Sequence, residues 1–274
     1  MRHGLFFPPF GDLAEPARVV ELAVEAEAHG WDGVFLWDHM IRPAGQPQEL
    51  ADAWTVLTAV AAATERIRLG PMITPLARRR PQKVARETVT LDRLSEGRLV
   101  LGVGLGVNSG GELERFGEEV DDRARAARLD EALDLLFNLW SGGEVDHRGP
   151  HFTAQGVRFL PTPLQSPRIP VWAAARGEPM RPGPLRRAAR LDGLFPVGAT
   201  PERLAEMVST VGEMRGSLEG FEVAAEVGPD ADQHHVGRLV AAGATWILRS
   251  LPVDVTAKEV RRLATTMPAE VGGR

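Results

Sequence analysis

Residues 82–103 read QKVARETVTLDRLSEGRLVLGV, and they place a helix, a stop and a strand in direct succession. Val84 and Leu91 lie on one face of the helical part, as the apolar residues of an amphipathic helix do. Ser95-Glu96-Gly97 ends the helix, and the aliphatic run from Arg98 to Val103 follows as a buried strand. A strand that directly follows a helix is typical of a parallel sheet with helical crossovers.

The same alternation continues in both directions from this stretch. Seven further strands are predicted at Gly4–Phe7, Gly33–Trp37, Ile67–Thr74, Pro170–Ala174, Gly193–Pro196, Phe221–Val227 and Thr245–Leu251. A barrel of this type closes with eight strand-helix units. Such barrels reach about 250 residues as one domain. We therefore predict an α/β fold, a (β/α)8 TIM barrel, in a single domain over residues 1–274.

The rhythm is interrupted after the fourth strand by an insertion segment. One strong helix is predicted from Arg123 to Trp140, and residues 141–168 are rich in Gly, Pro and Gln. Long connections without regular structure in a compact domain are usually functional. We expect this connection to fold over the mouth of the barrel, with a substrate space beneath it.

Composition excludes several classes of function. The chain has no cysteine, so disulfides and thiolate chemistry are absent. His147 and His151 have a metal-like spacing, but Gly149-Pro150 breaks any helix that would align them, and no metal site is expected. The net charge of −5 argues against nucleic acid binding. Without a signal peptide or a long apolar run, we expect a cytoplasmic protein with no membrane association.

The residues that follow the strands are the candidates for chemistry, because the site of such a barrel lies at the carboxyl ends of its strands. Asp38-His39 follows the second strand, and a carboxylate beside a histidine can adjust its basicity. Gly102-Val103-Gly104-Leu105-Gly106-Val107-Asn108 follows the fourth strand, but the third glycine of a dinucleotide fingerprint is missing at its place and no helix starts directly after the glycines. The stretch instead indicates a strand end without side chains against which a flat ligand can lie, with Asn108 as a bidentate polar contact. Arg78-Arg79-Arg80 either covers a solvated surface or attracts an anionic group at the mouth.

A candidate phosphate site follows the fifth strand. Three small residues and one cationic residue stand shortly before a predicted helix, namely Ala174, Ala175, Gly177 and Arg176. Free backbone N–H groups at a helix N-terminus favour anions, although an ordinary connecting loop is an equal alternative on these residues alone.

The chain also resembles the bacterial luciferase-like superfamily, whose members use reduced FMN with oxygen or the deazaflavin coenzyme F-420 for hydride transfer. The motifs that carry the resemblance are spread in order over most of the chain. They include Gly30-Trp31-Asp32-Gly33-Val34-Phe35-Leu36-Trp37-Asp38-His39, Leu91-Asp92-Arg93-Leu94-Ser95-Glu96-Gly97-Arg98-Leu99, Arg128-Leu129-Asp130-Glu131-Ala132-Leu133, Gly149-Pro150-His151-Phe152 and Pro163-Leu164-Gln165-Ser166-Pro167.

The resemblance implies roles for the candidate residues. Asp38 and His39 match the Asp-His that lies beside the deazaflavin ring as acid/base and anchor. Met72 and Ile73 fall where the family commonly has a nonprolyl cis bond whose bulge supports the ring. Asn108 matches a cofactor-contacting asparagine, and Ala174 to Gly177 match the backbone that binds the cofactor phosphate.

Two residues depart from the family pattern. Leu105 stands where the sugar-phosphate dehydrogenases of the family carry a catalytic glutamate, so that such a substrate is not expected. Arg176 replaces the first glycine of the usual Gly-Gly phosphate loop.

The hypothesis that follows is an F-420-dependent oxidoreductase that transfers a hydride to or from a small organic substrate. The resemblance also implies a homodimer, as is usual in the family. One alternative is an FMN-dependent two-component monooxygenase, supplied by a separate flavin reductase. Two others are a metal-dependent barrel hydrolase and a flavin-binding protein without catalysis.

Overall fold

A closed ring of parallel strands forms the centre of the computed structural model, which describes residues 1–42 and 45–266. The strands of the ring, in order around it, are β1 (Arg2–Phe7), β2 (Gly33–Leu36), β3 (Arg68–Pro71) with its continuation β4 (Thr74–Pro75), β5 (Leu101–Gly104), β8 (Val171–Arg176), β9 (Gly193–Val197), β10 (Glu222–Val227) and β11 (Trp246–Ser250). β11 pairs with β1, and the β4–β5 pairing together with a bridge between Leu69 and Leu99 closes the remaining gap. The predicted TIM barrel is confirmed.

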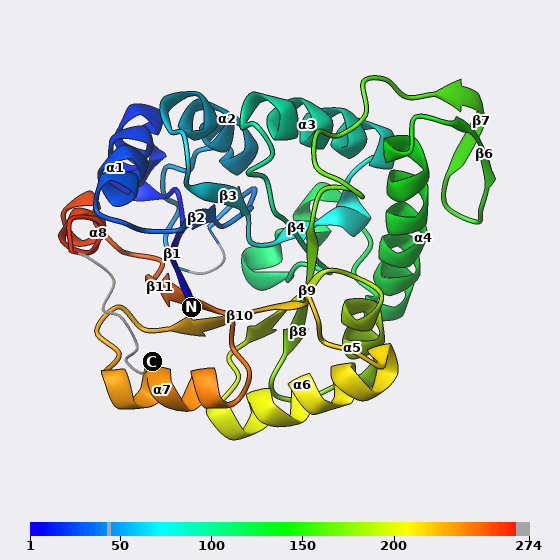
Figure 1. Ribbon diagram of the computed structural model, residues 1–274. Coiled ribbons are helices and arrows are strands. Elements are labelled where there is room, and N and C mark those ends of the chain that lie inside the picture. Colours follow the sequence, from blue (N-terminus) through cyan, green and yellow to red (C-terminus); the bar gives the residue numbers. More distant parts are fainter. Residues whose placement is uncertain (43–44, 267–274) are drawn as a thin grey trace.

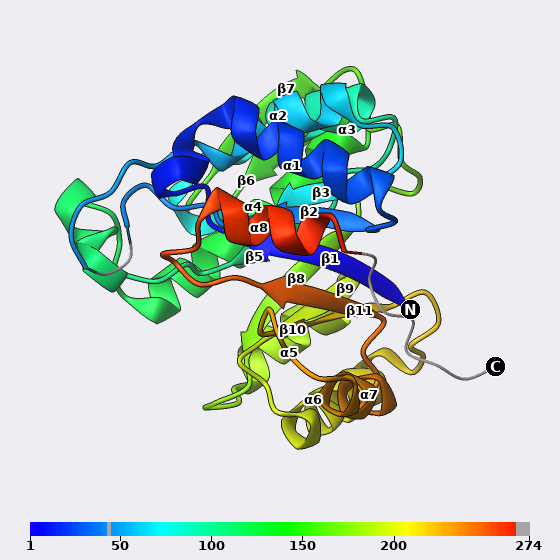
Figure 2. The ribbon, with the colours of Figure 1, turned by 90° about the vertical axis from the view of Figure 1, so that its left-hand side faces the viewer.

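Helices surround the ring, as Figures 1 and 2 show. They are α1 (Pro16–Ala28), α2 (Ala53–Ala63), α3 (Pro81–Leu94), α4 (Asp122–Trp140), α5 (Pro182–Ala189), α6 (Pro201–Arg215), α7 (Gln233–Ala241) and α8 (Ala257–Ala264). The third predicted strand, Ile67–Thr74, is divided at Met72 and Ile73 into β3 and β4. Among the helices of the described residues, none is both long and apolar enough to cross a membrane.

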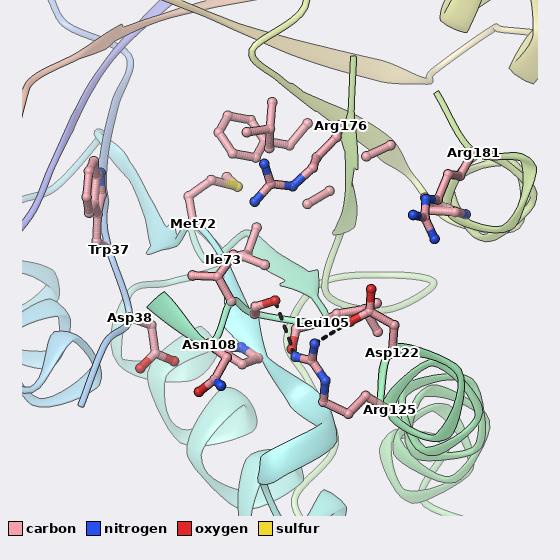
Figure 3. Close-up of a pocket in the computed structure, with 18 of the residues that line it drawn as sticks. Trp37, Asp38, Met72, Ile73, Leu105, Asn108, Asp122, Arg125, Arg176 and Arg181 are labelled. Carbon is pink, nitrogen blue, oxygen red and sulfur yellow. Dashed lines mark hydrogen bonds and ion pairs between the residues drawn. The ribbon is translucent and has the colours of Figure 1, made fainter. Parts of the chain in front are cut away.

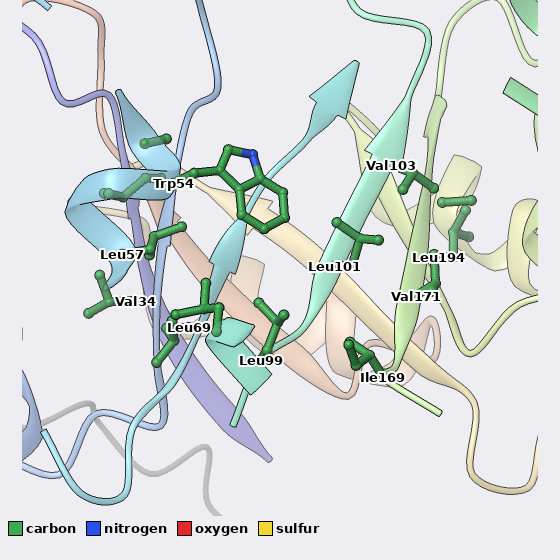
Figure 4. Close-up of a cluster of buried hydrophobic side chains, with 14 of the residues drawn as sticks. Val34, Trp54, Leu57, Leu69, Leu99, Leu101, Val103, Ile169, Val171 and Leu194 are labelled. Carbon is green, nitrogen blue, oxygen red and sulfur yellow. The ribbon is translucent and has the colours of Figure 1, made fainter. Parts of the chain in front are cut away.

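Two hydrophobic clusters form the core of the protein. The larger one lies between the strands and the helices, and Figure 4 shows Leu57 of α2 and Trp54 beside the aliphatic residues of β2, β3, β5 and β8. The smaller one fills the ring itself, where the rings of Phe35, Trp172 and Trp246 lie with their centroids 5.6–5.7 Å apart. Because these rings block the barrel, a ligand can enter it only near an end.

Residues 141–168 of the insertion segment lie away from the mouth, so the prediction that they cover it is wrong. Helix α4 carries the chain back along the barrel, and residues 141–168 therefore begin at the opposite end. There they form the hairpin β6 (Glu144–Arg148) and β7 (Thr153–Arg158) beside α4, at the outer edge of Figure 1. Gln165 donates to the carbonyl of Leu99, which precedes the start of β5.

Candidate active site

A cavity of about 820 Å³ opens at the carboxyl ends of the barrel strands, where a TIM-barrel site is expected. Figure 3 shows side chains that surround it from several strands. Eight of the nine sequence-predicted site residues line it, namely Asp38, His39, Met72, Ile73, Asn108, Ala174, Ala175 and Arg176. Gly177 is the exception, because its N–H donates to the carbonyl of Val197 at 2.9 Å and it does not belong to the lining.

A backbone bulge between β3 and β4 projects into this cavity. The peptide bond between Met72 and Ile73 is cis, as the resemblance implied. Glycines of β5 make room for its side chains: a Cβ on Gly104 would lie 2.1 Å from Cδ1 of Ile73, and one on Gly102 would lie 2.6 Å from Sδ of Met72. Gly102 and Gly104 thus seat the bulge and do not leave bare backbone for a flat ligand, whereas Gly106 of the same stretch lines the cavity.

Asp38 is an ion-paired wall residue and not a free carboxyl group. Its two oxygens both accept from Nη2 of Arg79 at 2.8 Å, and Oδ2 also accepts from the indole N–H of Trp54. The residue is 4% exposed. Both carboxylate oxygens of Asp38 are thus occupied by side chains of the cavity wall.

His39 is paired with Glu112, a residue that sequence reasoning missed. Nδ1 of His39 lies 2.5 Å from Oε2 of Glu112, and Oε1 of the same carboxylate accepts from the backbone N–H of Met40 at 2.7 Å. Nη1 of Arg78 donates to it as well. A carboxylate at Nδ1 favours the tautomer that leaves Nε2 free to accept a proton.

The pKa of Glu112 lies below its ordinary value. Burial alone would raise this pKa, but the hydrogen bonds and charges of His39 and Arg78, with the N–H of Met40, outweigh it. Glu112 therefore stays ionised beside His39. The only sequence signal for it was an acidic residue in the loop after the fourth strand.

The arginine cluster belongs to this network. Arg78 forms an ion pair with Glu112, and its Nη2 lies 3.5 Å from Oδ1 of Asp38. Arg79 forms an ion pair with Asp38. Only Arg80 of the three is exposed, at the start of α3. Two of its three charges are neutralised inside the wall, and none of the three side chains belongs to the lining of the cavity.

Asn108 keeps only half of its predicted bidentate contact. Its Oδ1 accepts from the backbone N–H of Leu113 at 2.9 Å and of Glu114 at 3.3 Å, so the oxygen is committed to the loop. The NH₂ group remains to donate to a ligand in the cavity.

The side of the cavity formed by β8 carries unpaired positive charge. Arg176 and Arg181 both line the cavity, both are exposed, and neither has an ion-pair partner among the described residues. Figure 3 shows Arg176 directed into the cavity from the end of β8. Helix α5 begins there, but Pro182 and Pro184 remove two of its first three N–H groups. The guanidinium groups, more than the helix N-terminus, make this side suitable for an anion.

Glu226 is a second carboxylate that sequence reasoning missed. It lies at the end of β10 and lines the cavity. Burial raises the pKa of its carboxyl group, although hydrogen bonds from Gly198 and Ser250 act in the opposite direction. Among the described residues, no group of three or more His, Asp or Glu side chains could hold a metal ion, so the hydrolase alternative has no ligand set there.

Comparison with curated proteins identifies F-420-dependent glucose-6-phosphate dehydrogenases as relatives. The protein of Rhodococcus erythropolis is 39% identical over 166 residues, which cover 59% of this chain and 48% of the relative. The protein of Gordonia bronchialis is 35% identical over 177 residues, which cover 63% and 51%. The chain thus spans about half the length of the curated relatives it matches.

Solved structures share the fold over nearly the whole chain. An F-420-dependent secondary alcohol dehydrogenase, in complex with an F-420-acetone adduct, superposes with a TM-score of 0.79 at 20% identity and covers 96% of this chain and 98% of its own. A monooxygenase of Streptomyces bottropensis also has a TM-score of 0.79 at 20% identity, covering 96% of each chain.

The profile of one family matches most of the sequence. The luciferase-like monooxygenase profile aligns with residues 1–236, which include every strand of the ring except β11. The resemblance stated from the sequence motifs is thereby confirmed, and the chain belongs to the luciferase-like monooxygenase family.

Proposed function

We propose that this protein is an F-420-dependent oxidoreductase that transfers a hydride between the deazaflavin and a small organic substrate. The observation that carries the proposal is the Met72–Ile73 bulge inside the cavity, with the His39–Glu112 pair in the same lining. The names of the curated relatives support F-420 over FMN. The arginine cluster does not help to choose between the two cofactors, because Arg78 and Arg79 are paired with Glu112 and Asp38.

The cavity residues fit a flat, anionic cofactor. Gly102 and Gly104 allow the bulge to form a support for a ring, since any Cβ there would displace Met72 or Ile73. Asn108 offers an NH₂ donor, and Arg176 and Arg181 offer unpaired charge for a phosphate. When bound, the deazaflavin would supply the hydride acceptor or donor.

The chain's own contribution is orientation and proton transfer. Glu112 holds Nδ1 of His39, which leaves Nε2 to take the proton of a substrate hydroxyl. The hydride would leave the carbon atom that bears this hydroxyl and pass to the cofactor. In the reverse direction Nε2 returns the proton to the carbonyl oxygen. We assign Asp38 the part of a positioning residue, since it anchors Arg79 and Trp54 beside the pair.

Titration of the purified apoprotein by fluorescence tests the proposal. We expect F-420 to bind at micromolar concentration or tighter, and His39→Ala and Asn108→Ala to weaken it. His234→Ala, at an exposed histidine of α7, is the matched control and leaves binding unchanged. Selective binding of reduced FMN would favour the monooxygenase, binding without turnover would favour a carrier, and binding of neither cofactor would refute the proposal.

Further predictions accompany this function. We propose a homodimer, a cytoplasmic location and one domain over residues 1–274, of which 43–44 and 267–274 lie outside the described residues. A separate flavin reductase is needed only if FMN is the cofactor. Sedimentation of the purified chain tests the dimer.

A further inference from the structure

The position of Glu226 in the ring of strands sets it opposite the bulge. From β3 the order runs through β5, β8 and β9 to β10 in one direction, and through β2, β1 and β11 to β10 in the other. β10 is thus four strands from β3 both ways. Glu226 at the end of β10 and Met72–Ile73 at the end of β3 therefore face each other across the cavity.

A ring supported by the bulge has its free face toward this wall. Apart from Glu226, the wall is largely apolar. It is lined by Phe6 of β1, by Trp37 directly after β2, and by Phe195 and Val197 of β9. Phe6 lies with its ring centroid 5.5 Å from that of Phe195 and 5.8 Å from that of Trp37. A substrate that reacts at the free face must contact these side chains.

Glu226 has no positive partner in this wall. Its Oε1 accepts from the backbone N–H of Gly198 at 2.7 Å, and Ser250 is a further hydrogen-bonding neighbour. None of the described basic side chains forms an ion pair with it. Arg176 and Arg181 extend from β8 and the connection after it, and β8 is two strands from β10. Glu226 is half-buried, and its carboxylate keeps acceptor capacity that a hydroxyl or amino group of a ligand can satisfy.

We propose that Glu226 determines the substrate class: it binds a hydroxyl or amino group of an otherwise apolar, uncharged or cationic substrate, and it excludes anions such as sugar phosphates. The inference rests on the proposed function, because the cofactor defines which wall is free. The negative charge of Glu226 opposes the binding of an anionic substrate at a contact without water. In this substrate preference the chain would differ from the relatives named for glucose-6-phosphate.

Three probes with one apolar body and different head groups test this directly: cyclohexylmethanol, cyclohexylmethylamine and cyclohexanecarboxylate. Binding is measured by calorimetry at neutral pH, with and without F-420, on wild type and on Glu226→Gln. We expect the wild type to bind the amine and the alcohol at least tenfold more tightly than the carboxylate. In Glu226→Gln the ratio of amine to carboxylate affinity falls at least tenfold.

Glu178→Gln is the matched control, because Glu178 also lines the cavity but is exposed and paired with Arg203. It keeps the wild-type ratio. Equal wild-type affinity for carboxylate and amine, an unchanged ratio in Glu226→Gln, or no binding of any probe would each overturn the inference. F-420 affinity is read separately in the same titrations, so a failure of the cofactor assignment is distinguished from a failure at Glu226.

Discussion

Replacing Glu112 by glutamine keeps the shape of the side chain and removes the charge on which three donors converge. The carboxylate is 1% exposed and accepts from His39, Met40 and Arg78. An amide offers one acceptor oxygen and turns its NH₂ toward one of these donors, which leaves a buried cation without its partner. Breaking a buried ion pair in this way costs about 3–5 kcal/mol.

Urea unfolding followed by tryptophan fluorescence measures the loss. The control is Glu114→Gln, a neighbouring exposed carboxylate in the same loop, which we expect to change stability by less than about 0.5 kcal/mol. Glu112→Gln also loosens His39, so the chemical step slows by about 100-fold, the lower bound of what a positioned acid/base contributes.

The pH dependence of the same pair of proteins gives a second readout. The folded-state pKa of Glu112 is below its ordinary value, because the hydrogen bonds and charges of His39 and Arg78 outweigh burial. Its carboxylate therefore stabilises the fold at neutral pH, and this stabilisation is lost as the pH falls through the folded-state pKa. The gap between wild type and Glu112→Gln should close in acid. A gap that widens in acid, or a neutral-pH loss no larger than that of Glu114→Gln, would refute the reasoning.

Three further changes probe other parts of the site. Gly104→Ala pushes the side chain of Ile73 into the cavity, and overpacking of about 1–3 kcal/mol should weaken F-420 binding about tenfold in a fluorescence titration; unchanged affinity would contradict the support role of the bulge. Arg176→Ala should weaken F-420 binding and reduce its dependence on salt concentration, and an unaltered salt dependence would count against a phosphate contact. His147→Ala removes the contact of the β6–β7 hairpin with Glu131 of α4, and we expect a lower Tm with no change in cofactor affinity; weaker binding would favour the expectation that residues 141–168 cover the mouth.

The barrel could be predicted from the sequence because its strands and helices have local signals. Runs such as Arg98 to Val103 differ in period from the helices around them, and local hydrophobic spacing decides each element. The sequence does not predict the position of residues 141–168, because that position depends on the direction in which α4 returns along the barrel. That direction is a property of the assembled ring and not of residues 141–168.

The positions of site residues could be predicted better than their contacts. Strand ends converge at one mouth, so Asp38, His39 and Asn108 were found by position alone. The partners of Arg78 and Arg79 come from other loops, 34 and 41 residues away in sequence, and no local pattern connects them. The cis bond was implied by the resemblance, not by residue pattern.

A crystal structure of the protein with oxidised F-420 tests the central claim most directly. We expect one face of the deazaflavin to lie against the Met72–Ile73 backbone, Nε2 of His39 to lie beside the ring, and the other face to be open toward Glu226. A ring bound outside this cavity, or one that stacks on the Glu226 wall with its free face toward the bulge, would contradict it.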